Sequence, residues 1–214
     1  MLLQSEMKPK EYSLITMARI DYPLSPERIM SELVPWFTTW GFDLDTSKSI
    51  SDTISLFMES RESPRWGLLG NGVVASERHA WSAWTILRRL ELHGKCVAKS
   101  PDTEFLRIVA GTRQIKEGIR RSGLSQDDKI GWVFYLPEHR GETPLGSERI
   151  PRSCYNTHSN NAMRIISSLN GRLVVKRPVP TEFGLSRIGG DVLDGESDSL
   201  ETSFIHHLTN SIIN

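Results

Sequence analysis

Hydrophobic and polar positions along the chain follow two spacings, one typical of helices and one typical of strands. Apolar residues three or four apart, preceded by capping residues such as Ser76 or by Ser-Pro pairs, predict helices. The predicted helices cover residues 25–36, 77–93, 101–110, 113–122, 160–170 and 200–212. Short apolar runs rich in β-forming residues predict strands. The predicted strands cover residues 11–22, 54–58, 72–76, 129–136 and 172–176.

This mixture predicts a single mixed α/β domain over residues 1–214, with a small sheet of three to five strands and several helices packed on it. Two segments interrupt the pattern. Residues 138–160 are rich in Gly, Pro and charge, and residues 177–199 are rich in Pro and Gly and then acidic. Such composition predicts loops or mobile insertions, and therefore an extended C-terminal third.

Composition restricts the classes of function. The formal net charge is zero, so nucleic-acid binding would have to depend on a local basic patch. The chain contains no run of about 18 apolar residues and no apolar stretch near its start that is typical of a signal peptide. Two cysteines, Cys96 and Cys154, are too few for a disulfide framework and suit a reducing compartment. We therefore expect a cytoplasmic protein with no membrane-spanning segment.

A local basic patch follows a helix break at Gly111. The stretch Glu104–Arg121 holds five basic and two acidic residues. On the helix that follows the break, the helical spacing places Arg113, Lys116 and Arg120 on one face. A helix start beside an arginine can bind an anion or a phosphate through backbone amides and charge. The alternative from charge alone is a helix–helix corner with a solvated basic face.

The residues around this break resemble a known family. The chain reads Glu-Phe-Leu at 104–106, Ala-Gly-Thr-Arg-Gln-Ile at 110–115 and Ser-Gly-Leu at 122–124, and residues 73–80 include a helix-initial His79. The order of these segments is similar to that of the small KEOPS-complex subunit that binds the complex's atypical kinase, the PRPK-binding protein family of archaeal type. The resemblance covers residues 70–137.

This resemblance implies a non-catalytic accessory subunit. Family members bind the KEOPS kinase subunit and recruit tRNA through its 3′ CCA end for N6-threonylcarbamoyladenosine synthesis. It implies no cofactor, metal, small-molecule substrate or membrane. It assigns RNA contact to Gly111, Arg113, Gln114, Lys116 and Arg120, with Arg78 and His79 as further candidates. The C-terminal helix is expected to help dock the kinase. The family often has alanine where Gly118 stands, so this helix is expected to be less stable by about 1 kcal/mol.

Two other classes of function remain open. One is a small α/β enzyme that acts on an anionic substrate at the Arg113 helix start, with His79 as its only candidate base. The other is a protein–protein interaction module whose basic face meets an acidic partner. Cys154 and His158, four residues apart, have metal-ligand spacing without further ligands, so we expect a structural role for both. Trp81 and Trp84 are expected to be core residues.

Overall fold

The structure, a computed structural model, describes residues 34–45, 47–138, 150–193 and 199–213, with the side chains of the last segment described to residue 209. The described strands form one antiparallel sheet in the order β2-β3-β1-β4. Their bounds are β1 Thr39–Asp43, β2 Trp66–Leu69, β3 Ile130–Tyr135 and β4 Arg172–Val174. Val133 of β3 lies opposite Trp40 of β1 and Leu68 of β2, which fixes the register of the three central strands.

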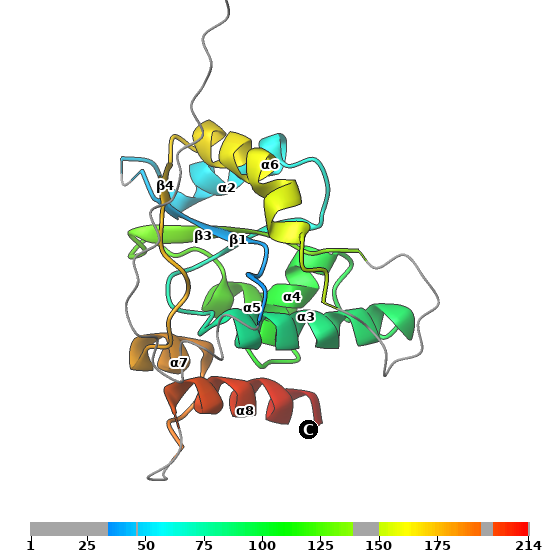
Figure 1. Cartoon of the computed structure of the whole chain (residues 1–214). Coiled ribbons are helices and arrows are strands. Elements are labelled where there is room, and N and C mark those ends of the chain that lie inside the picture. The colour runs from blue at the N-terminus through cyan, green and yellow to red at the C-terminus, as the bar shows by residue number, and fades with distance from the viewer. Residues whose placement is uncertain (1–33, 46, 139–149, 194–198, 214) are drawn as a thin grey trace, which may run out of the picture.

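Seven helices of the described residues pack around this sheet. They are α2 Ile50–Ser60, α3 Glu77–Leu92, α4 Pro101–Val109, α5 Ile115–Ser122, α6 Cys154–Ser168, α7 Glu182–Ile188 and α8 Leu200–Ile213. Figure 1 shows α2 and α6 on one face of the sheet and α3, α4 and α5 on the other, with α7 and α8 beyond α3. Helix α8 contacts α3 and α4, and α7 contacts α5 and α8.

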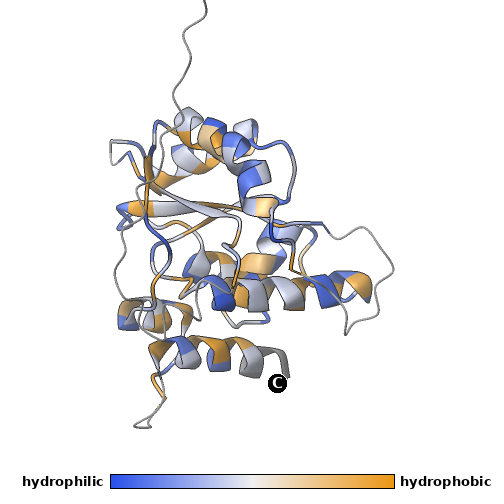
Figure 2. Cartoon of the chain, viewed as in Figure 1, coloured by the Kyte–Doolittle hydropathy of each residue, from blue (hydrophilic) through white to orange (hydrophobic). Residues whose placement is uncertain are grey.

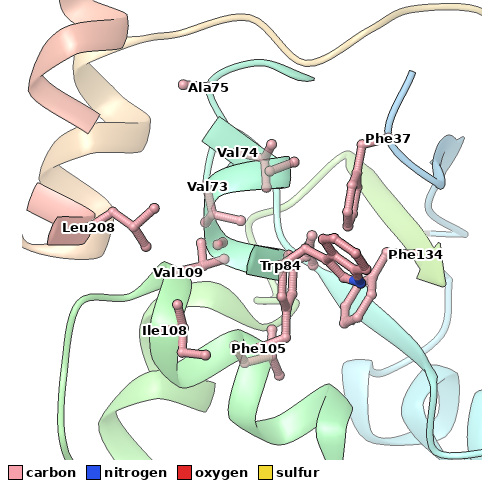
Figure 3. Packing of buried hydrophobic residues seen from close by; sticks show 14 of the residues in the cluster. Phe37, Val73, Val74, Ala75, Trp84, Phe105, Ile108, Val109, Phe134 and Leu208 are labelled. Carbon is pink, nitrogen blue, oxygen red and sulfur yellow. The ribbon is translucent and has the colours of Figure 1, made fainter. Parts of the chain in front are cut away.

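Alternation along the strands creates two hydrophobic cores. Trp40, Phe42 and Val133 pack with the cluster under α2 and α6. Phe134 faces the opposite way and packs with Phe105 and the α3 side of the sheet. Figure 3 shows this second cluster, which α8 joins through Leu208. In Figure 2 the covering helices carry both hydrophobic and hydrophilic residues, as expected for helices with one buried face.

The mixed α/β class is confirmed, and the sheet of four described strands lies within the predicted range of three to five. Helices α3, α4, α5 and α8 lie where the hydrophobic spacing predicts them, and β3 lies within the predicted residues 129–136. Ser76 caps α3 as expected, because its side chain accepts a hydrogen bond from the backbone N–H of His79 at 3.1 Å. The strand predicted over 11–22 and residues 25–33 of the helix predicted over 25–36 lie outside the described residues, and residues 34–36 are not helical.

Two strand predictions are wrong. Residues 54–58 belong to helix α2, in which Thr53 and Phe57, one helical turn apart, face the sheet while Ile54 and Met58 are exposed. Ser49 begins that helix by accepting a hydrogen bond from the N–H of Asp52. Residues 72–76 form a buried connection and pair with no described strand. The strand on this side of the sheet is β2, four fully buried residues.

The C-terminal third is more regular than expected. Helix α6 begins within the predicted loop 138–160, and α7 lies inside the predicted loop 177–199. The side chain of Thr181 caps α7 by accepting a hydrogen bond from the N–H of Gly184 at 3.0 Å. Among the described helices, none has the length and apolar content required to cross a membrane.

Candidate functional site

The break between α4 and α5 is built on a buried ion pair. The carboxylate of Glu104, which is fully buried, accepts hydrogen bonds from Arg107 at 2.6 Å and 3.1 Å and from the backbone N–H of Ala98 at 2.8 Å. Arg107 also donates to the backbone oxygen of Thr112 at 2.7 Å. The pair therefore holds the turn that leads into α5.

Gly111 makes this turn possible. Its φ of 59° lies in the left-handed region, which favours glycine. A Cβ on this residue would lie 2.3 Å from Nε2 of His207, which is 3.3 Å from the oxygen of Ala110. We expected Gly111 to open the start of α5 to an external ligand. In the structure the space over Gly111 itself is occupied by α8 of the same chain.

The start of α5 is nevertheless accessible beside this contact. Gln114 is the N-cap residue, and its side chain makes no capping hydrogen bond. Arg113, Gln114 and Lys116 are exposed, and within the described part of the chain neither Arg113 nor Lys116 forms a hydrogen bond or ion pair. Helix α5 begins at Ile115, so the prediction that Arg113 lies on the helix is wrong, and only Lys116 lies in the first turn. The two unpaired cations flank a helix start whose first-turn amides have no partner within the helix.

Arg120 lies on the same exposed face but has a partner. It donates two hydrogen bonds to Glu117, at 2.6 Å and 2.8 Å, and Arg121 donates to the same carboxylate at 2.6 Å. Hydrogen bonds from Arg120 and then Arg121 lower the pKa of Glu117 to about 2. One carboxylate thus serves two guanidinium groups, which leaves this end of α5 positively charged.

The two upstream candidates lie at the start of α3, where both are close to α8. Arg78 is exposed at the start of α3, where it lies 3.8 Å from Glu201 of α8. His79 is fully buried, with its ring 5.3 Å from that of Phe204. A side chain in this position cannot contact RNA directly, so the assignment of His79 to an RNA surface is wrong for this structure. Its ring serves the packing of α8 on α3.

Gly118 has a packing role that helix propensity alone did not predict. A Cβ at this position would lie 2.7 Å from Cα of Arg107, where α4 and α5 cross. We therefore expect Gly118→Ala to lower the free energy of unfolding by roughly 1–3 kcal/mol through overpacking, although alanine is the better helix former. Urea denaturation checks this, with Glu59→Ala on the exposed side of α2 as a near-neutral control. A stabilised Gly118→Ala variant would contradict the crossing geometry.

Helix α7 contributes residues that sequence reasoning missed. The guanidinium group of Arg187 binds both oxygens of Asp128, at 2.6 Å and 2.9 Å. It also donates to the backbone oxygens of Arg121, Gly123 and Asn71. Arg187 therefore fixes α7 against the end of α5. The signal in the sequence was Thr181 followed by a short apolar helix and Gly189, within a segment whose composition suggested a loop.

The remaining candidates have structural surroundings. His158 stacks on Tyr135 with ring centroids 3.8 Å apart, and burial raises the pKa of Cys154 to about 11. Trp81 and Trp84 are buried and donate indole hydrogen bonds to Pro35 and Pro137, as expected for core residues. Within the described ranges, no group of three or more His, Cys, Asp or Glu residues is arranged to hold a metal ion.

Comparison with known proteins adds no family assignment: no protein-family model and no curated sequence matches the chain. Interpretation of the α5 face therefore depends on its geometry and on the residues around the helix break.

Proposed function

We propose that the protein is a non-catalytic, tRNA-binding accessory subunit of a cytoplasmic KEOPS complex, which binds the kinase subunit and recruits tRNA through its 3′ CCA end for N6-threonylcarbamoyladenosine synthesis. The observation that carries the proposal is the exposed face at the start of α5, where Arg113 lies just before the N-cap residue Gln114 and Lys116 and Arg120 follow on the helix. Such a face offers backbone amides and cations to phosphates without a basic field over the whole chain.

The environment of His79 weighs against the enzyme alternative. Burial, with a smaller contribution from His207, lowers the pKa of His79 to about 3. Its Nδ1 already accepts a hydrogen bond from the N–H of Ala75 at 3.2 Å. A fully buried, hydrogen-bonded imidazole is separated from any ligand bound at Arg113, so it does not supply the base that this alternative requires.

Arg113→Glu is the variant that tests RNA binding. We expect it to weaken binding of intact tRNA by about tenfold or more and to reduce the salt dependence of affinity by about one phosphate contact. Removing the 3′ CCA end from the tRNA is expected to weaken binding to the wild-type protein similarly. Affinities should be measured at several salt concentrations, since phosphate-driven affinity varies with ionic strength.

Arg172→Glu provides the matched control, because it reverses an exposed arginine on the edge strand β4. Both variants should still bind the KEOPS kinase subunit, which separates RNA binding from complex assembly. If the wild-type protein binds intact and CCA-less tRNA equally and Arg113→Glu has no effect, the RNA role is wrong. Kinase binding that persists in that case would favour a purely protein-binding module.

A further inference from the structure

A cleft lies where the C-terminal end of α5 meets α7. Its volume is about 370 Å³, and it is lined by Arg120, Arg121, Phe183, Ser186, Arg187 and Gly189. This volume lies in the range of sites that hold a small organic ligand. The cleft continues the exposed face of α5, because Lys116 and Arg120 lie one helical turn apart and lead toward it, with Arg113 just before the N-cap residue.

Three arginines line the cleft, but they are not equivalent. Arg187 is bound by Asp128 through its two terminal guanidinium nitrogens and has little exposed surface, so its charge is neutralised. Arg120 and Arg121 share the single carboxylate of Glu117, and the side chain of Arg120 is 68% exposed. An anion can therefore bind Arg120 and Arg121 by replacing Glu117, without disturbing the support that Arg187 provides.

Phe183 adds a flat apolar surface to this charged cleft. It lies on α7, and 65% of its surface is exposed. Single exposed apolar residues are common and need no explanation by themselves. Here the ring lines the same cleft as two arginines that share one carboxylate. Cations for the phosphate and an aromatic ring for the base are the combination by which proteins hold single-stranded nucleic acid.

We propose that one unpaired nucleotide of the bound RNA enters this cleft, with its base stacked on Phe183 and its phosphate replacing Glu117 at Arg120 and Arg121. The proposal rests on the proposed function, since it extends the RNA track along α5. From Lys116 to Arg120 the helix rises about 6 Å, at about 1.5 Å per residue, so a strand that passes Arg113 and Lys116 would reach the cleft about one helical turn further on.

A coupled substitution in protein and RNA tests the contact. Phe183→Ala is expected to weaken tRNA binding by about fivefold to a hundredfold, the range for loss of one base–aromatic stack. An abasic residue is placed in turn at each unpaired 3′ position of the tRNA. At one position the abasic tRNA should lose affinity for the wild-type protein but no further affinity for Phe183→Ala. Phe183→Trp should retain binding.

Val175→Ala is the matched control, because it truncates an exposed apolar residue beside β4. Glu117→Gln should bind tRNA more tightly than the wild type, because two arginines are released from their carboxylate. Thermal unfolding should show that each variant is folded.

If Arg113→Glu abolishes binding while Phe183→Ala does not, or if every abasic effect adds to that of Phe183→Ala, the nucleotide site is wrong and the proposed function survives. Weaker binding by Glu117→Gln would also contradict the displacement. If neither Arg113 nor the CCA end affects binding, the proposed function itself fails.

Discussion

Replacing Glu104 with glutamine should lower the free energy of unfolding by about 3–5 kcal/mol, the range for breaking a buried ion pair. Both partners are buried, with 0% of the Glu104 side chain and 9% of the Arg107 side chain exposed. The substitution would leave the guanidinium group of Arg107 charged and unpaired between α4 and the core. Urea denaturation at neutral pH measures the loss.

Two further variants separate this effect from a general sensitivity to losing charge. Glu62→Gln breaks an ion pair to Arg164 in which both side chains are about half exposed, so it should cost less than about 1 kcal/mol. The double variant Glu104→Gln with Arg107→Met should recover part of the loss, because no unpaired charge remains. A loss below about 1 kcal/mol for Glu104→Gln alone would show that the pair contributes little.

The same pair explains why a motif residue far from the exposed cations matters to the site. Glu104 holds Arg107, and Arg107 in turn binds the oxygen of Thr112 just before α5 begins. Oγ1 of Thr112 accepts a hydrogen bond from the N–H of Gln114 at 3.2 Å. Loss of Glu104 should therefore disturb the direction in which α5 leaves the turn, and with it the position of Arg113.

The sequence predicted the helices and strands whose formation depends on their own residues. Helix α3 has a capping serine and an apolar stripe, and β3 has a continuous β-forming run, so both were predicted from their own residues. The run at 54–58 was misread because five apolar or small residues fit either spacing, and burial of Thr53 and Phe57 against the sheet decides in favour of a helix. Strand β2 has only four residues and contains Gly67, which leaves room for the ring of Phe134.

The sequence predicted the part of the candidate site in which all residues belong to one helix. The helical spacing of Lys116 and Arg120 places these two together without knowledge of the fold, whereas Arg113, predicted to lie on the same helix, lies before its N-cap residue. Contacts between distant segments could not be predicted in this way. His207 over Gly111 and Arg187 beneath the end of α5 come from α8 and α7, which follow in the chain by more than sixty residues. The spacing of hydrophobic residues along the chain does not indicate which helix will pack over a given turn.

His79 should make the protein sensitive to acid. Its side chain is fully buried, and burial, then the nearby charge of His207, lowers its pKa from 6.5 to about 3. Protonation of Nδ1 would direct a second N–H toward the N–H of Ala75, which currently donates to that nitrogen. Nε2 is also buried and has no hydrogen-bond partner among the described residues, so a charged ring gains nothing at its other side.

The direction of the effect follows from proton uptake. Between pH 6.5 and about 3 the unfolded chain protonates this histidine and the native chain does not. Stability contributed by the neutral ring is therefore present above pH 6.5 and is lost as the pH falls. The free energy of unfolding should decrease by up to about 1.4 kcal/mol per pH unit, or about 3 kcal/mol between pH 7 and pH 4.

Comparison with His79→Asn isolates this contribution from the carboxylates that titrate in the same range. Asparagine retains an acceptor for the N–H of Ala75 but does not titrate, so its stability at pH 7 should be lower and its pH dependence shallower. His93→Asn, which changes an exposed histidine at the end of α3, is the control for replacing a histidine outside the core. Urea denaturation from pH 7.5 to pH 4 gives all three curves. Parallel curves for the wild type and His79→Asn would mean that the His79 ring is protonated in the native state. Helix α8 would then have to open to solvent where Phe204 lies beside the ring.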